Sequence, residues 1–183
     1  MPHPKHFLIA VALMIAVVLS QGVALGANPT EYTIKAAYLS KFGSFVEWPA
    51  DTFPEPTSAL NLCIVGVDPF GEALDELVAG QQVDSHPIKV KRIPDITDGA
   101  DCQIVFVDGN DVRRALKVVS VLRGSRVLTV TDTGDETEGA GIINFIVEGN
   151  KVRFGVDDKA AKNNGLRISS RLLMLAVYVW DSQ

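Results

Sequence analysis

Four short apolar runs, separated by stretches with helical periodicity, most constrain the fold of this chain. The runs cover residues 60–67, 103–107, 126–130 and 141–147, and they are dominated by apolar side chains without regular polar alternation. Continuous apolar strands are typical of parallel sheets covered by helices on both faces. Because helical segments are predicted between the runs, at residues 72–79 and 111–122, the sequence predicts an α/β fold. We expect a mixed, largely parallel sheet flanked by helices on both faces, in a single compact domain.

Two further helices and a hairpin are predicted outside this central region. Residues 31–46 form a helix ended by Trp48-Pro49, because proline lacks an N–H and biases the preceding residue away from helix. Its apolar side chains recur on one helical face, which consists of Ile34, Ala37, Tyr38, Phe42 and Phe45. A strand is expected at 88–92, and a tight turn at 148–150 predicts a hairpin with a strand at 151–156. A last helix is predicted from Asp157-Asp158 to about Val179.

The first 27 residues have the order of a secretory signal peptide. A short basic start precedes 13 apolar residues, 7–19, and small residues follow at 22–27. A bilayer-spanning helix needs about 20 apolar residues, so the 13-residue run favours a signal peptide over the alternative, an uncleaved anchor that continues through Ala27 across Ser20, Gln21 and Gly22. We expect cleavage after Ala27, with Ala24 as the alternative, leaving an exported domain of residues 28–183. Residues 1–27 contain one lysine and no acid, so this domain carries a net charge of −6, against −5 for the whole chain.

Cysteine and histidine usage limits the chemistry that the exported domain can perform. Cys63 and Cys102 are the two cysteines, and an even pair in an exported protein predicts a disulfide. His86 is the one histidine beyond residue 27, and it lies in a polar loop without a neighbouring nucleophile motif. Zinc sites need three or four His, Cys or carboxylate ligands. We therefore expect no metal, no cofactor and no Ser-His-Asp mechanism, and the acidic charge argues against nucleic-acid binding.

Two local sequence patterns are candidate functional sites. Asp132-Thr133-Gly134 follows an apolar run, as in aspartic proteases, where two such carboxylates share a proton. A single copy would require a homodimer, and alternating strands and helices contradict an all-β protease, so a plain turn is the better interpretation. Arg167 and Arg171 are spaced four residues apart on the predicted last helix, where they could bind an anion or an acidic partner.

Motifs at both ends of the chain resemble the YfiR family. Residues 32–49 (YTIKAAYLSKFGSFVEWP) are similar to that family's opening helix, which ends in Phe-Val-Glu-Trp-Pro. Three closing motifs are similar as well, and they begin at Ile143, Val152 and Gly165. Candidate motif or interface residues carried by the resemblance are Trp48, Pro49, Asn144, Phe154, Gly165, Arg167, Ser169, Ser170 and Arg171.

The resemblance implies a small periplasmic α/β protein without catalytic activity. Characterised members repress an inner-membrane diguanylate cyclase through its periplasmic sensor domain, which lowers cyclic-di-GMP signalling and limits biofilm formation. They also form dimers, so a homodimer is expected. Cys63 and Cys102 match the family's central disulfide. A second cysteine pair, which some members carry in the stretch corresponding to residues 137–144, is absent here, so the redox control associated with it is in doubt.

A second functional class stays open beside the repressor. The chain would then be a periplasmic module that binds a small ligand for another membrane system, using Arg167, Arg171 and the region of Asn144 and Phe154. The aromatic residues near the chain ends are candidate interface anchors, with core packing as the alternative: Phe45, Trp48, Tyr178 and Trp180.

Overall fold

The computed structural model describes residues 29–96, 101–134 and 140–180, so the predicted signal peptide of residues 1–27 lies outside the described residues. Within these ranges, no helix combines the length and apolar character needed to cross a bilayer. The helices are α2 (Pro29–Phe42), α3 (Glu72–Val78), α4 (Val112–Val121), α5 (Asp158–Asn163) and α6 (Ser170–Leu173), with 3-10 turns at Gly43–Phe45 and Gly109–Asp111.

An eight-stranded mixed sheet forms the centre of the fold, in the order β10-β8-β7-β6-β5-β2-β4-β3. Its strands are β2 (Leu60–Val65), β3 (Gln82–Val83), β4 (His86–Ile93), β5 (Ile104–Val107), β6 (Leu128–Thr131), β7 (Ile143–Glu148), β8 (Lys151–Asp157) and β10 (Tyr178–Trp180). The run from β4 through β2, β5 and β6 to β7 is parallel, while β3 and β8 are antiparallel to their neighbours β4 and β7. The largely parallel sheet that the apolar runs predicted is confirmed.

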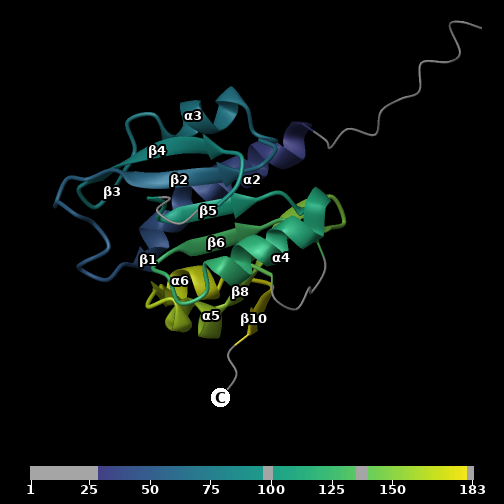
Figure 1. Cartoon of the computed structure of the whole chain (residues 1–183). Helices are drawn as coiled ribbons and strands as arrows, with labels where there is room; N and C mark the ends of the chain where they lie inside the picture. The colour runs from purple at the N-terminus through teal and green to yellow at the C-terminus, as the bar shows by residue number, and fades with distance from the viewer. Residues whose placement is uncertain (1–28, 97–100, 135–139, 181–183) are drawn as a thin grey trace, which may run out of the picture.

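Helices cover both faces of this sheet, as predicted. Figure 1 shows α4 crossing one face, with α2 and α3 on the other. The buried side chains divide in the same way. The larger cluster joins the sheet to α2 and α3 and includes Leu39, Phe42, Phe106 and Phe154, and the smaller one, beside α4, includes Val105 and Val118.

The predicted hairpin is present between β7 and β8. Gly149 and Asn150 both have positive φ, 53° and 61°, which suits the tight turn that the right-handed twist of a hairpin favours. The hairpin does not form the edge of the sheet, however, because β10 pairs with β8 in parallel outside it. This additional strand was not predicted.

The predicted long last helix is wrong. Helix α5 ends at Asn163, and two short strands and α6 occupy the rest of the segment, with β9 at Arg167–Ile168. Buried Asn164 interrupts the helix: its Oδ1 accepts from Gly124 N at 2.7 Å and its Nδ2 donates to Val127 O at 2.9 Å. Gly165 then adopts φ +73°, a left-handed conformation that ends helices. Of the apolar residues Leu172, Leu173, Leu175, Ala176 and Val179 in this segment, only Leu172 is buried.

The predicted first helix is present, and its predicted apolar face lies only partly against the core. Helix α2 ends at Phe42, and a short strand, β1 (Val46–Glu47), follows the 3-10 turn. The buried side of α2 holds Lys35, Ala36 and Leu39, all at most 1% exposed. Of the predicted face, Phe42 is also 1% exposed, whereas Ile34 and Ala37 are exposed.

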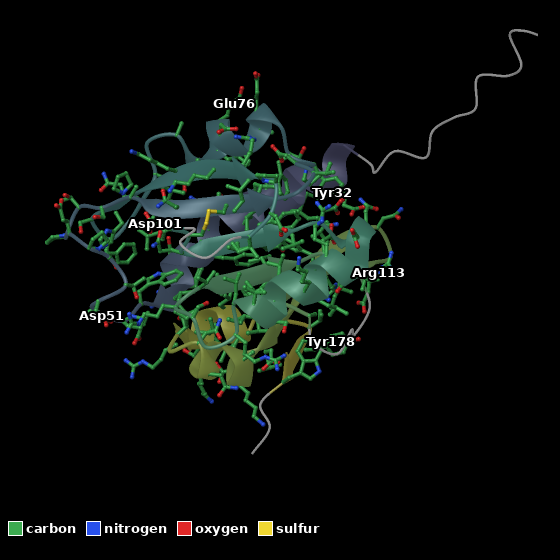
Figure 2. The ribbon with its side chains drawn as sticks, viewed as in Figure 1. Tyr32, Asp51, Glu76, Asp101, Arg113 and Tyr178 are labelled. Carbon is green, nitrogen blue, oxygen red and sulfur yellow. A yellow bond between two sulfur atoms is a disulfide. The ribbon has the colours of Figure 1, made fainter. Side chains whose placement is uncertain are left out.

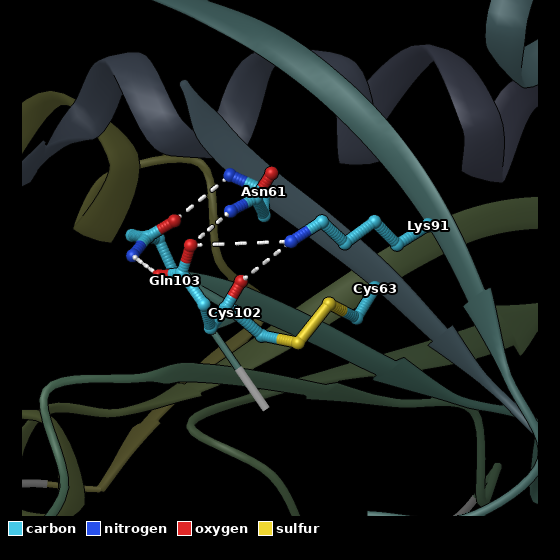
Figure 3. The surroundings of a disulfide bond; sticks show 6 residues. Asn61, Cys63, Lys91, Cys102 and Gln103 are labelled. Atoms are coloured by element: carbon cyan, nitrogen blue, oxygen red, sulfur yellow. Dashed lines mark hydrogen bonds and ion pairs between the residues drawn. A yellow bond between two sulfur atoms is a disulfide. The ribbon is translucent and has the colours of Figure 1, made fainter. Parts of the chain in front are cut away.

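The predicted disulfide is confirmed. Cys63 on β2 and Cys102 just before β5 are bonded, with their Cα atoms 5.9 Å apart. Figure 3 shows the polar side chains around it: Asn61 N donates to Gln103 Oε1 at 2.8 Å, and Asn61 Nδ2 donates to Asp101 Oδ2 at 2.8 Å. Because β2 and β5 are adjacent, the bond ties together two strands that the intervening helix and β4 separate by 39 residues in sequence.

Candidate functional site

The two end motifs meet in a small antiparallel ribbon. Strand β1 pairs with β9, and the register places Val46 opposite Ile168 and Glu47 opposite Arg167. The backbone extends this contact, since Ser169 N donates to Phe45 O at 2.8 Å. Residues more than 120 positions apart in sequence thereby form one structural unit, which we call the β1–β9 ribbon.

Several of the motif residues around the ribbon have structural roles. The Ser169 side chain caps α6 by accepting from Arg171 N at 3.3 Å, and Ser170 begins that helix. Gly165 lies against Pro49, because a Cβ on this glycine would be 3.7 Å from Pro49 Cγ. Trp48 Nε1 donates to Gly43 O at 3.4 Å. These contacts help to fix the local geometry of the surface around the ribbon.

A buried ion pair joins α2 to the carboxyl end of β6. Lys35 Nζ lies 2.8 and 2.7 Å from the two carboxylate oxygens of Asp132, and it also bonds Glu31. Side-chain exposure is 2% for Lys35 and 8% for Asp132. Burial raises the pKa of Asp132, and the adjacent lysine opposes this shift. Asp132 is therefore paired within its own chain, which disfavours the aspartic-protease hypothesis.

A second polar contact lies at the carboxyl end of the neighbouring strand, β5, and joins Tyr32 to Asp108. Tyr32 donates to Asp108 Oδ1 at 3.3 Å, and Asn110 Nδ2 donates to Asp108 Oδ2 at 2.6 Å. Burial, followed by the charge of Asp108, raises the pKa of Tyr32 well above its usual range. Figure 2 shows Tyr32 and Asp51 on opposite sides of the molecule, so this cluster lies far from the loop that carries Asp51.

Asn144 belongs to the core, and Phe154 is a core residue that also lines a surface groove. Asn144 is 1% exposed, and its Oδ1 accepts from Thr131 Oγ1 at 2.9 Å and from Thr133 N at 3.1 Å. It orients the chain that leaves β6. Phe154 is also 1% exposed and packs edge to face on Phe42, with ring centroids 5.3 Å apart. The structure does not bring these two residues together with Arg167 and Arg171 as a binding site.

The two arginines differ in their partners. Arg167 forms an ion pair with Glu47 across the β1–β9 ribbon, its Nε 2.8 Å from the carboxylate. For Arg171, no acidic side chain among the described residues forms an ion pair with the guanidinium, which is exposed on α6. Arg171 is therefore the arginine whose charge stays available to a partner.

A mixed aromatic and acidic pocket lies on one side of the ribbon. This Trp48 pocket has a volume of about 710 Å³ and is lined by residues of the 44–56 segment and by Asp84, Ser85 and His86. His86 stacks on Phe53 with ring centroids 3.6 Å apart, and its Nδ1 lies 2.7 Å from Ser58 O. Three carboxylates, those of Glu47, Glu55 and Asp84, line the pocket, and no lysine or arginine is among its lining residues.

An apolar groove lies between α2 and α6 on the other side. This α2–α6 groove has a volume of about 480 Å³. Its lining is almost entirely apolar and consists of Thr33, Ile34, Ala37, Tyr38, Lys41, Phe42, Phe45, Phe154, Leu172 and Leu175. All five residues of the apolar face that sequence periodicity predicted are in this lining. The periodicity thus identified a real apolar face, which is buried at Phe42 and exposed in a surface groove at Ile34 and Ala37.

The structural role of Lys35 and the two surface depressions were not predicted from the sequence. A lysine inside an apolar helix face carries little signal, because lysine is almost never fully buried unless it is paired. Its partner Asp132 is 97 residues away in sequence, and no local pattern connects them. Of the candidate anchors, Phe45 lines the groove and Trp48 the pocket, while Tyr178 and Trp180 are exposed on the edge strand β10.

Comparison with known protein families is decisive for the classification. Among the described residues, no group of three or more His, Cys, Asp or Glu side chains is arranged to hold a metal ion. The model of the YfiR/HmsC-like family matches residues 32–177. This range begins in α2 and ends just before β10, so it includes both strands of the β1–β9 ribbon and the disulfide. The chain therefore belongs to the YfiR/HmsC-like family.

Proposed function

We propose that this chain is a periplasmic repressor of an inner-membrane diguanylate cyclase. It binds the cyclase's periplasmic sensor domain, and this lowers cyclic-di-GMP signalling and biofilm formation. The observation that carries the proposal is the family match over residues 32–177, because members of this family are regulators of that kind. A repressor acts by binding one state of its partner more tightly than the other.

The arrangement of charged groups supports a binding role over a catalytic one. The carboxylates at the ends of β5 and β6 are engaged inside the molecule, Asp108 by Tyr32 and Asp132 by Lys35. A general acid or base must reach the proton it transfers in a bound substrate. By contrast, the two depressions beside the β1–β9 ribbon are open to a partner or ligand.

Export and self-association are part of the same proposal. Residues 1–27 direct the chain to the periplasm and are removed there, and the mature protein is a homodimer. The mass of protein recovered from the periplasmic fraction should correspond to a chain beginning at Asn28. Sedimentation of that protein should give twice the monomer mass, and a purely monomeric species at micromolar concentration would contradict the dimer.

Deletion of the gene tests the proposed function directly. We expect cyclic-di-GMP and surface attachment to rise in the deletion strain and to return to the parental level when the full chain is restored. The response should disappear when the partner cyclase is also deleted. An unchanged cyclic-di-GMP level in the single deletion strain would refute the proposal.

The Trp48 pocket favours a second candidate function, small-ligand binding for another membrane system. Aromatic rings next to carboxylates are suited to a cationic ligand, since a cation is attracted by both. We expect a panel of small organic cations to contain one that raises the melting temperature of the protein, while its neutral analogue does not. The Glu55→Gln, Asp84→Asn variant should lose that shift. A panel without any stabilising cation would remove the support that this pocket lends to the alternative.

A further inference from the structure

The α2–α6 groove exposes apolar surface that the fold itself does not cover. Its deepest residues, Phe42 and Phe154, are 1% exposed and belong to the core. Two other lining residues are exposed to solvent, Ile34 at 38% and Leu175 at 63%. Met174, which precedes Leu175, is 78% exposed, more than any other large apolar side chain among the described residues. Contiguous apolar surface of this kind marks interaction sites on soluble proteins.

The one charged residue in the lining of the groove is basic, and so is Arg171, the sequence neighbour of the lining residue Leu172, although the chain as a whole is acidic. Lys41 lines the groove, and its Nζ donates to the neutral amide of Gln81 at 2.8 Å. Arg171 precedes Leu175 by one helical turn on the α6 side and has no ion-pair partner among the described residues. None of the residues that line the groove is acidic. In a chain with 22 acidic and 17 basic residues, this local reversal selects for an acidic partner.

The same charges disfavour a second copy of this chain as the occupant. In a two-fold contact the same patch faces itself, so Lys41 and Arg171 of both copies would be brought together. No helix in the described chain offers the required complement: acidic α3 buries its apolar residues Leu74 and Val78. A concave groove between two helices is also poorly shaped for lying on a membrane, where an amphipathic segment buries a convex apolar face.

We propose that the α2–α6 groove binds a helical segment of a partner protein, with an apolar face and acidic flanks. Apolar side chains at positions i, i+3 or i+4, and i+7 would enter the groove, and flanking Asp or Glu side chains would pair with Lys41 and Arg171. The volume of about 480 Å³ accommodates a few anchoring side chains and not a folded domain. The identity of the partner, the sensor domain of the membrane-bound cyclase, rests on the proposed function, whereas the chemistry of the segment does not.

Site-specific crosslinking of the full chain in living cells tests this assignment. A photoreactive benzoyl-phenylalanine is placed at Ala37, an exposed lining residue, and in a control protein at Val121, which is 51% exposed on α4. The crosslinked peptide is identified by mass spectrometry. We expect an adduct from position 37 and none from position 121. The captured peptide should have apolar residues at helical spacing and at least two flanking acids.

Charge reversal separates a specific complex from nonspecific apolar adhesion. Arg171→Glu should lower the yield of the position-37 adduct about tenfold, as expected when a charge pair becomes a repulsive contact at an interface. Arg123→Glu is the matched control, because it changes the net charge by the same amount at a position just after α4. It should leave the yield of the position-37 adduct within twofold. Equal effects of the two reversals would overturn the proposal. Leu175→Glu should abolish the adduct without unfolding the protein, because Leu175 is 63% exposed.

Other occupants give different outcomes, and each of them overturns the proposal. A position-37 adduct with a second copy of this chain would assign the groove to the dimer. Flotation with phosphatidylglycerol vesicles that is lost in Leu175→Glu would assign it to the membrane. Absence of any position-37 adduct would leave the groove without a partner. The proposed function and the groove assignment can fail separately. If the captured acid-flanked peptide comes from a protein other than a cyclase and deletion of the gene leaves cyclic-di-GMP unchanged, the proposed function is refuted. The assignment of the groove to a helical, acid-flanked segment is then retained.

Discussion

Replacing Lys35 by methionine should strongly destabilise the fold. The ammonium group lies within 2.8 Å of both Asp132 carboxylate oxygens, and the lysine residue is 1% exposed. Removing one member of a buried ion pair leaves an unpaired buried charge, which costs about 3–5 kcal/mol of unfolding free energy. We expect a loss in this range for Lys35→Met, measured by urea unfolding of the oxidised protein at pH 7.5. The double variant Lys35→Met, Asp132→Asn should recover about 1–3 kcal/mol of it.

An exposed ion pair of similar length provides the control. Arg126 Nη2 lies 2.6 Å from Asp51 Oδ2, and the two side chains are 50% and 68% exposed. Exposed pairs typically contribute about 0.2–1 kcal/mol, so Arg126→Met should have a small effect. A loss below about 1 kcal/mol for Lys35→Met, or strictly additive single variants, would refute the view that burial makes the Lys35 pair strong.

The cost of Lys35→Met should also depend on pH, with a defined sign. Burial raises the pKa of Asp132 in the folded protein, and loss of the lysine removes the contact that opposes this shift. The folded variant therefore binds a proton at a pH where the unfolded chain, with a carboxyl pKa of about 3.9, does not. Stability then falls as pH rises through the folded pKa. The difference from the unmodified protein should be smaller at pH 5 than at pH 7.5, and a constant difference would contradict this account.

Three further predictions concern the disulfide, a close backbone contact and the β1–β9 ribbon. Replacing both Cys63 and Cys102 by serine should lower the free energy of unfolding by about 4 kcal/mol, the chain-entropy value for a loop of roughly 40 residues, in a urea titration compared with the oxidised protein. Gly109→Ala should reduce the melting temperature markedly in calorimetry, because a Cβ there would lie 1.5 Å from a backbone oxygen that follows β6. Arg167→Ala should cost less than about 1 kcal/mol in urea unfolding, since Arg167 and Glu47 are 79% and 66% exposed.

Much of the central sheet could be predicted from sequence because its signals are local. The apolar run at 103–107 and the positive-φ turn at Gly149 and Asn150 each determine an element within a few residues. The disulfide followed from cysteine count and compartment, without knowledge of the strand order. The last helix was mispredicted because Asn164 breaks it through hydrogen bonds to Gly124 and Val127, about 40 residues away. Local helical propensity does not contain that contact.

The candidate site also combines features that local sequence patterns predict with features that depend on long-range contacts. Sequence resemblance identified the end motifs, yet their pairing as the β1–β9 ribbon depends on backbone contacts across 120 residues. Sequence periodicity identified an apolar face on α2, yet it cannot tell which of two adjacent faces meets the sheet. In the folded protein, the face of α2 that carries Lys35 meets the sheet and Lys35 pairs with Asp132, so Ile34 and Ala37 are left at the surface.

The fold class, the hairpin, the cysteine pair and the resemblance to a family of regulators can be recognised from the amino-acid sequence. They follow from short-range patterns and from composition, which do not depend on long-range contacts. Three features become visible in the folded chain alone: which side of α2 is buried, which of Arg167 and Arg171 has an ion-pair partner, and where the groove and the pocket lie. These features depend on pairs of groups distant in sequence, whose burial and charge balance exist only once the chain has folded.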